Sequence, residues 1–135
     1  MITTAHPTDE TIRVLFIEND SAVAEMYKLK LELDGYQVTV IANDDLVLET
    51  AARVRPDMIF LDLRVGNDRG LTTLQQLRAS DGTRYVPVII LSNQAASELA
   101  GRGFKADPLD YVVRAESGPI DLVGTMEVWA RTGSG

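Results

Sequence analysis

Short apolar runs alternate with amphipathic stretches along this chain, which is the pattern of strands followed by helices. The apolar runs are rich in β-branched residues, and each ends abruptly at a polar residue. They predict five strands, over residues 12–17, 36–42, 58–61, 86–91 and 110–113. Strands that alternate with helices form a parallel sheet covered on both faces. The pattern therefore predicts an α/β fold with a doubly wound, five-stranded parallel sheet.

The stretches between the strands have helical features. The first has a capping residue at Asp20 or Ser21 and ends at Gly35. The second starts at Asn43 or Asp44 and ends at Pro56, since proline lacks the N–H that a helix needs. The residues expected to face the core are Val23, Met26, Tyr27 and Leu33 in the first helix, and Leu46, Val47, Ala51 and Val54 in the second.

Three more helices complete the pattern. One carries Leu71, Leu74 and Leu77, a weaker one spans residues 94–100, and the last begins near Pro119. We expect one domain over residues 12–131, preceded by a polar arm over residues 1–11. Residues 132–135 form a flexible C-terminal end in this prediction.

Composition narrows the classes of function. A chain of 135 residues that is 45% hydrophobic and 24% charged has the composition of one soluble globular domain. It has no cysteine, and His6 is its only histidine, which excludes thiolate sites and leaves little for histidine chemistry. The net charge of −7 argues against direct binding to nucleic acid. No apolar run could span a bilayer, so we expect a cytoplasmic protein without membrane contact.

Polar residues follow four of the predicted strands at the point where each strand ends. In an open α/β sheet, ligands bind beyond the carboxyl ends of the strands, where the strand order reverses. Carboxylates, a hydroxyl and a cation at that edge suit Mg²⁺ and a phosphoryl group. The residues expected there are Glu18, Asn19, Asp20, Asp62, Ser92 and Arg114.

Four segments resemble the receiver domains of two-component signalling: VLFIEND, MIFLDL, PVIILS and DYVVR. Each segment alone is a weak signal, but their order and spacing match that family over residues 12–131, and Gly70 follows Asp62 at the family's distance. The resemblance implies a flavodoxin-like sheet with strand order 2-1-3-4-5.

The resemblance also implies a role for each residue at the strand ends. Asp62 is the expected phosphoacceptor, and a carboxylate is a known covalent nucleophile. Ser92 takes the position of the switch hydroxyl and Tyr111 that of the switch aromatic residue. Arg114 is the expected phosphate partner, in the place where the family has a lysine. An arginine keeps the charge but not the geometry of an ammonium group.

The implied metal site is Mg²⁺ held by Glu18, Asn19, Asp62 and the backbone carbonyl of Arg64. Asn19 stands where the family usually has a carboxylate that ligates the metal directly. An amide oxygen can ligate Mg²⁺ but brings no charge, so we expect weaker binding. In the alternative interpretation Glu18, Asn19 and Asp20 form an ordinary solvated turn, with Asp20 as the helix cap.

The leading functional prediction is a stand-alone receiver that is not an enzyme. A histidine kinase or phosphotransfer protein would donate the phosphoryl group to Asp62. The signal would then pass to a downstream protein by contact, with no direct role for nucleic acid. The resemblance also allows two copies to pair through the face of the fourth helix, fifth strand and fifth helix. The rival prediction is a pseudo-receiver, never phosphorylated, that acts as a constitutive docking module. Asn19, Arg114 and Ala115 favour it, and Ala115 stands where the family usually has a proline. A separate alternative for Arg114 is that it is a structural partner that neutralises Asp62 permanently.

Overall fold

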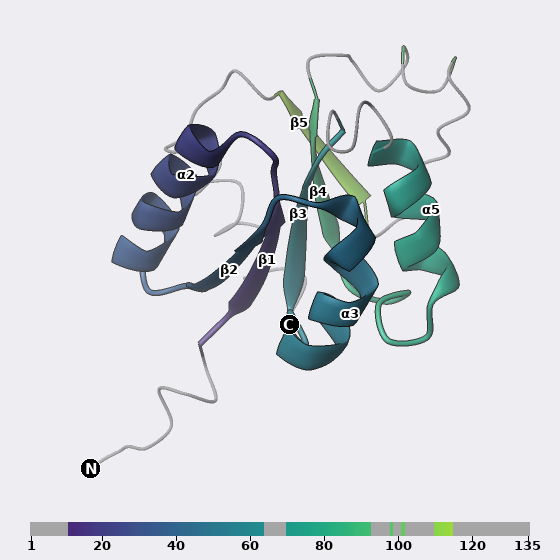
Figure 1. Cartoon of the computed structure of the whole chain (residues 1–135), viewed down its shortest axis with the longest axis horizontal. Helices are drawn as coiled ribbons and strands as arrows, with labels where there is room; N and C mark the ends of the chain where they lie inside the picture. The colour runs from purple at the N-terminus through teal and green to yellow at the C-terminus, as the bar shows by residue number, and fades with distance from the viewer. Residues whose placement is uncertain (1–10, 64–69, 93–97, 99–100, 102–109, 115–135) are drawn as a thin grey trace.

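A five-stranded parallel sheet forms the centre of the molecule (Figure 1). The structure is a computed structural model that describes residues 11–63, 70–92, 98, 101 and 110–114. The strand order is β2-β1-β3-β4-β5, and each neighbouring pair is parallel. This confirms the predicted doubly wound, flavodoxin-like sheet. The strands are β1 (Arg13–Ile17), β2 (Gln37–Ile41), β3 (Met58–Asp62), β4 (Val88–Ser92) and β5 (Asp110–Arg114).

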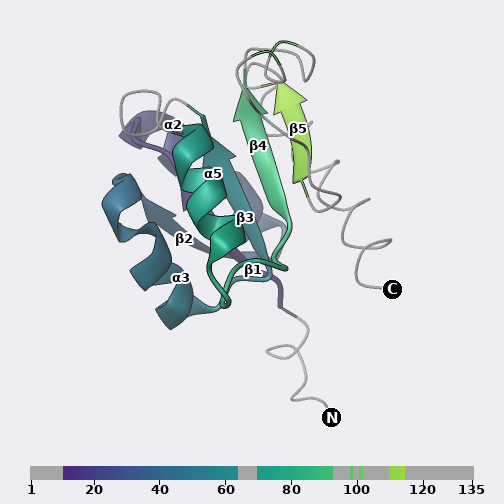
Figure 2. The ribbon, with the colours of Figure 1, turned by 90° about the vertical axis from the view of Figure 1, so that its right-hand side faces the viewer.

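Helices cover both faces of the sheet. Helix α2 (Ser21–Leu33) lies on one face, and α3 (Val47–Val54) and α5 (Gly70–Ala79) lie on the other (Figures 1 and 2). A 3-10 turn, η1 (Asp44–Leu46), leads into α3. The two further helices predicted over 94–100 and from Pro119 lie outside the described residues, apart from isolated positions.

Two separate apolar clusters make up the core, one on each face of the sheet. On the α3 and α5 face, Leu15, Ile17, Leu61 and Ile90 pack with Leu77. The α2 face has a second cluster, formed by Val14, Phe16, Tyr27, Leu31, Val38, Met58, Phe60, Ile89 and Leu91. Successive residues of one strand therefore belong to different clusters, because strand side chains point alternately to opposite faces.

The helix ends largely follow the predicted capping signals. The Asp20 carboxylate accepts hydrogen bonds from the backbone N–H groups of Ala22 at 3.0 Å and Val23 at 3.2 Å, and so caps α2. Asn43 caps the 3-10 turn through the N–H of Asp45 at 2.9 Å. Helix α3 ends at Val54, because Arg55 adopts the left-handed conformation with φ 55.

Three residues predicted to face the core are exposed. Met26 and Leu33 lie on the solvent side of α2, and Leu46 is exposed in the 3-10 turn. The prediction was wrong at Met26 and Leu33 because Ala24 and Leu31 share the buried arc of α2 with Tyr27. It was wrong at Leu46 because this residue belongs to the 3-10 turn, which has no buried residue. Two apolar arcs on one helix cannot both face a single sheet.

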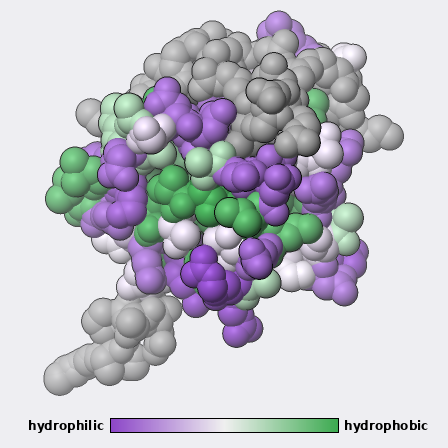
Figure 3. All heavy atoms as spheres, in the orientation of Figure 1, coloured by the Kyte–Doolittle hydropathy of each residue, from purple (hydrophilic) through white to green (hydrophobic). Residues whose placement is uncertain are grey.

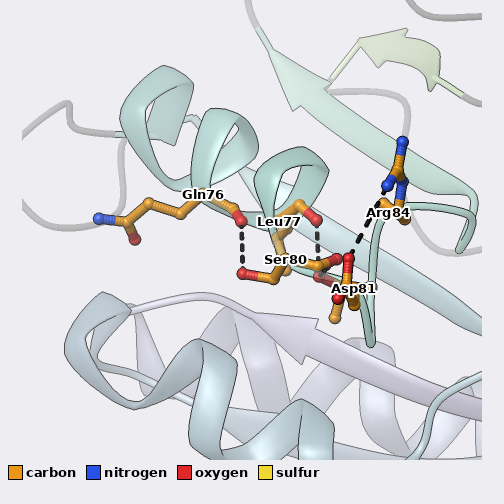
Figure 4. Close-up of polar contacts among 6 residues, drawn as sticks. Gln76, Leu77, Ser80, Asp81 and Arg84 are labelled. Atoms are coloured by element: carbon orange, nitrogen blue, oxygen red, sulfur yellow. Dashed lines mark hydrogen bonds and ion pairs between the residues drawn. The ribbon is translucent and has the colours of Figure 1, made fainter.

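The fourth strand starts two residues later than predicted. The N–H of Val86 donates to the carbonyl of Thr83 at 3.0 Å, and the carbonyl of Val86 accepts from the Arg78 guanidinium at 2.7 Å. These bonds hold Val86 in the turn that follows α5. Figure 4 shows this turn, with the Ser80 hydroxyl donating to the carbonyl of Gln76 at 2.9 Å. Since Pro87 has no N–H, regular pairing begins at Val88.

Candidate functional site

Two acidic residues lie at the carboxyl ends of adjacent central strands. Ile17 of β1 pairs in register with Leu61 of β3. The residue that follows is an acid in both cases, Glu18 after β1 and Asp62 at the end of β3. The backbone N–H of Glu18 donates to the carbonyl of Ile41 at 3.0 Å, which extends the β1 ladder by one residue. Neighbouring strands are about 4.8 Å apart, so the two side chains start from adjacent backbone positions.

Both acids are buried, with Glu18 1% and Asp62 2% exposed. A buried carboxylate beside another is costly in its charged form, because like charges repel and burial removes water. A divalent cation between them would offset both costs. The prediction that Glu18 and Asp62 meet at this edge is therefore supported by the geometry of the strand ends.

Tyr27 of α2 also belongs to this region, and its electrostatic link to the acids was not predicted from the sequence. Its ring stacks on Phe16 with centroids 5.2 Å apart. Burial, and then the charges of Glu18 and Asp62, raise the pKa of the Tyr27 hydroxyl above its ordinary value of 10.0. The periodicity of α2 indicates that Tyr27 faces the sheet, but the distance of its hydroxyl from the strand ends depends on where the helix docks.

The raised pKa predicts how stability depends on pH at the alkaline end. Protonated Tyr27 contributes stability that is fully present below pH 10.0 and is lost as the pH rises through the higher folded pKa. We expect Tyr27→Phe to show a smaller fall in the free energy of unfolding over that range. Urea titrations at a series of pH values, in chelator, measure it. Tyr85→Phe, at an exposed tyrosine, is the matched control and should retain the wild-type slope.

The loop after β1 places Asn19 and Asp20 differently. Both residues are exposed, and one carboxylate oxygen of Asp20 accepts the two capping bonds of α2. The predicted alternative of a capped turn is thus correct for Asp20. Glu18 is not the capping residue of α2, and its side chain is buried.

The remaining strand ends bring Ser92 and Arg114 together in register. Asp62 pairs with Leu91 across β3 and β4, and Ser92 pairs with Arg114 across β4 and β5. Ser92 is the residue after Leu91, the partner of Asp62, and it is 6% exposed. Tyr111 pairs with Ile89, further back along β5. The backbone positions of the predicted site residues therefore agree with the predicted strand pattern. These residues are Asp62, Ser92, Tyr111 and Arg114.

Gly70 closes the loop that follows the central strand. Its N–H donates to the carbonyl of Leu63 at 3.1 Å. A Cβ at Gly70 would lie 2.5 Å from that carbonyl oxygen, so only glycine permits this approach without a backbone shift. The segment between them contains Arg64, which, like Ala115, lies outside the described residues.

The donor set at the edge suits Mg²⁺ better than a metal that needs many charged ligands. In the described part of the chain, no group of three or more His, Cys, Asp or Glu side chains could hold a metal ion. Mg²⁺ is usually bound through one or two carboxylates and keeps several waters. Glu18 and Asp62 could provide two such oxygen ligands, and an amide such as Asn19 could provide a neutral one.

Known proteins share both the sequence and the fold of this chain. Residues 14–123 match the family model of the response regulator receiver domain. The transcriptional regulatory protein CseB of Streptomyces avermitilis is 34% identical over 124 residues, covering 92% of this chain and 52% of that protein. The DNA-binding dual master transcriptional regulator RpaA of Synechocystis is 29% identical over 82% of this chain and 44% of its own length. The chain spans about half the length of these curated relatives.

Solved structures show the same fold at lower identity. The receiver domain of the sensor histidine kinase PA1611 from Pseudomonas aeruginosa, which has a magnesium ion coordinated in its active site cleft, is 23% identical with a TM-score of 0.77. It covers 90% of this chain and 99% of that domain. The chemotaxis protein CheY4 of Vibrio cholerae is 21% identical with a TM-score of 0.77, and the match covers 87% of this chain and 98% of that protein.

Among the helices that the structure describes, none has the length and hydrophobicity of a membrane-spanning segment. From its sequence and its fold, the chain belongs to the family of response regulator receiver domains of two-component signalling.

Proposed function

We propose that this receiver domain accepts a phosphoryl group on Asp62, with Mg²⁺ bound beside it. The observation that carries the proposal is the pair of buried carboxylates, Glu18 and Asp62, at the carboxyl ends of adjacent central strands. Two acids buried together at the edge of the sheet are suited to bind a cation, and the cation would then favour binding of a phosphoryl group.

The proposed reaction transfers a phosphoryl group from a histidine of the donor to Asp62. A carboxylate oxygen of Asp62 attacks the phosphorus of a phosphohistidine, and the bond from phosphorus to the imidazole nitrogen breaks as the acyl phosphate forms. The imidazole leaves with its electron pair and takes up a proton. Bound Mg²⁺ supplies positive charge that offsets the charges of the carboxylates and of the phosphoryl oxygens.

The remaining residues of the edge have roles in this proposal too. Ser92 donates its hydroxyl to a phosphoryl oxygen, and Arg114 pairs with the phosphoryl charge from the next strand. Tyr111 changes rotamer when the Ser92 hydroxyl moves, and this carries the change toward the surface of the fourth and fifth helices. The Arg64 backbone carbonyl would complete the protein ligands of a bound Mg²⁺.

The partners proposed for this chain follow from that chemistry. A histidine kinase or a phosphotransfer protein is the donor, and a downstream protein receives the signal by contact. The relatives include DNA-binding regulators, whereas the net charge of this chain, −7, argues against its own contact with DNA. A cytoplasmic location fits a donor of this kind.

Incubation with acetyl phosphate tests the proposal on the protein alone. We expect intact-protein mass spectrometry to detect one phosphoryl adduct in Mg²⁺ and none in excess chelator. A known receiver, labelled in parallel, shows that the reagent is active. If the folded chain gains no adduct in Mg²⁺ while the known receiver does, the proposal is wrong.

Restoring a carboxylate at Asn19 should strengthen the metal site. Asn19→Asp adds a negative charge next to Glu18, so we expect roughly tenfold tighter Mg²⁺ binding in isothermal titration calorimetry. Gln37→Glu, at the opposite end of the sheet, makes the same change in net charge and should leave the affinity unchanged. An equal gain in both variants would mean that the effect is the general field of the protein.

A second candidate function, constitutive docking without phosphorylation, is favoured by Asn19 in place of an acid. With Asn19 there, the described residues contain no group of three or more His, Cys, Asp or Glu side chains that could hold a metal ion. A docking module needs no metal, so Mg²⁺ affinity separates the two functions. Millimolar Mg²⁺ that causes no heat of binding in the wild type would favour docking.

A further inference from the structure

Helix α2 carries a tyrosine, Tyr27, into the core on its own face of the sheet. The helix leaves several apolar side chains on the surface of the molecule (Figure 3), whereas Tyr27 is only 4% exposed. Its ring stacks on Phe16 at 5.2 Å, and Phe16 stacks in turn on Phe60 at 5.3 Å. A phenylalanine would make the same ring contacts, and a tyrosine hydroxyl carried into a core usually has a hydrogen-bond partner. The role of this hydroxyl therefore depends on what lies beyond the stacked rings.

The two acids of the site lie directly beyond this aromatic stack. Phe16 pairs in register with Phe60. Glu18 and Asp62 each follow one of these phenylalanines by two residues. Residues two apart on a strand project to the same face of a sheet. Both acids therefore project to the α2 face, about 6.6 Å beyond the phenylalanines along the strands.

The direction of α2 turns the side chain of Tyr27 toward these acids. The helix begins at Ser21, three residues after Glu18, so its N-terminus lies at the edge of the sheet that carries the acids. The Cα–Cβ bonds of a helix tilt toward its N-terminus, and long side chains follow that direction. Burial first, and then the charges of Glu18 and Asp62, raise the pKa of the Tyr27 hydroxyl. The hydroxyl thus lies within electrostatic reach of both acids.

We infer that Tyr27 is a positioning residue of the metal site. Its hydroxyl donates a hydrogen bond to a water that in turn donates to the carboxylates of Glu18 and Asp62, and this keeps their oxygens oriented for Mg²⁺. The inference rests on the proposed function, because it needs these two acids to hold the cation. Bonds through a water are nearly as favourable as direct ones. A phenol donates a proton yet stays neutral at physiological pH, so it orients a carboxylate without competing with the cation for its charge.

Tyr27→Phe tests the hydroxyl alone, since it keeps the ring that stacks on Phe16. We expect Mg²⁺ to bind about tenfold more weakly in isothermal titration calorimetry, because groups that orient the ligands of a metal are typically worth about 10–100-fold in affinity. Tyr36→Phe is the matched control. Tyr36 packs against the same apolar cluster, but it precedes Gln37, the partner of Arg13 at the other end of the sheet. Its variant should bind Mg²⁺ as the wild type does.

The Mg²⁺ dependence of phosphorylation separates positioning from a purely structural role. With acetyl phosphate as the donor, Tyr27→Phe should need about tenfold more Mg²⁺ for its half-maximal rate. Its rate in saturating Mg²⁺ should stay within about twofold of the wild type, since the nucleophile is unchanged. A variant with a damaged site would lose rate at saturation as well.

Urea titration gives a second readout that does not use the reaction. A ligand that binds only the folded state raises the free energy of unfolding by an amount that grows with the ratio of its concentration to Kd. At a fixed Mg²⁺ concentration, the gain over chelator should therefore be smaller in Tyr27→Phe than in the wild type or in Tyr36→Phe.

The outcomes distinguish this inference from the function on which it rests. Equal Mg²⁺ affinities in Tyr27→Phe and the wild type would overturn the inference and leave the phosphoryl-acceptor proposal standing. Equal weakening in Tyr27→Phe and Tyr36→Phe would also overturn it, because the loss would then come from the packing of the shared cluster. A wild-type chain that binds no Mg²⁺ at millimolar concentration would refute the metal site itself, and the inference with it.

Discussion

Asp62→Asn is expected to take up no phosphoryl group from acetyl phosphate in Mg²⁺, under conditions in which the wild type gains one adduct. The amide is nearly the same size as the carboxylate but is a far weaker nucleophile at phosphorus. The variant should stay folded, with a thermal midpoint at least as high as that of the wild type. Replacing the buried Asp62 carboxylate by an amide removes its repulsion with the buried carboxylate of Glu18.

Asp57→Asn is the control that separates nucleophilicity from a loss of charge. Asp57 lies just before the other end of the same strand, exposed, with its carboxylate 3.4 Å from the Arg13 guanidinium and accepting from the Arg13 N–H at 2.9 Å. Its amide variant carries the same change in net charge and should be labelled fully. An adduct that persists in Asp62→Asn would place the acceptor elsewhere and refute the assignment.

Phe16→Ala is expected to lower the free energy of unfolding by about 3–5 kcal/mol. Phe16 is fully buried on β1, between Tyr27 of α2, at 5.2 Å, and Phe60 of β3, at 5.3 Å and nearly parallel. Truncation leaves a cavity against both rings. Native domains are stable by about 5–15 kcal/mol, so the loss is a large part of the total. Urea titration followed by circular dichroism measures it.

Tyr85→Ala removes a ring of similar size from the surface and serves as the comparison. Its ring is exposed, and the Arg84 guanidinium lies 5.0 Å from its centroid. We expect a loss of no more than about 1 kcal/mol, the scale of an exposed cation–π contact. Comparable losses in the two variants would mean that the stack around Phe16 is not the centre of its cluster.

The order of elements was predictable because the buried strands are nearly all apolar. Residues such as Phe60 and Ile89 lie between helices on both faces, so their strands have no polar alternation to obscure the pattern. The exact helix face was less predictable. Met26 and Leu33 are as apolar as Leu31, and composition alone cannot tell which arc of α2 meets the sheet. That choice depends on how the helix docks.

The site divides in the same way. Glu18 and Asp62 were predictable, because parallel strands in register bring their ends together without any knowledge of side-chain packing. Tyr27 was not, since its link to the two acids spans a helix and two strands. The close approach of Gly70 to Leu63 also depends on tertiary contact, although the distance from Asp62 to Gly70 follows the family pattern.

The division of the core by the sheet has a consequence for how this chain can change over generations. Leu15 and Phe16 are neighbours in sequence but belong to different clusters, whereas Val14 and Phe16 share one. Substitutions that share no packing partners have nearly additive effects on stability. Epistasis in this domain should therefore link residues two apart on a strand more strongly than residues next to each other. Each face can then drift while the other stays packed.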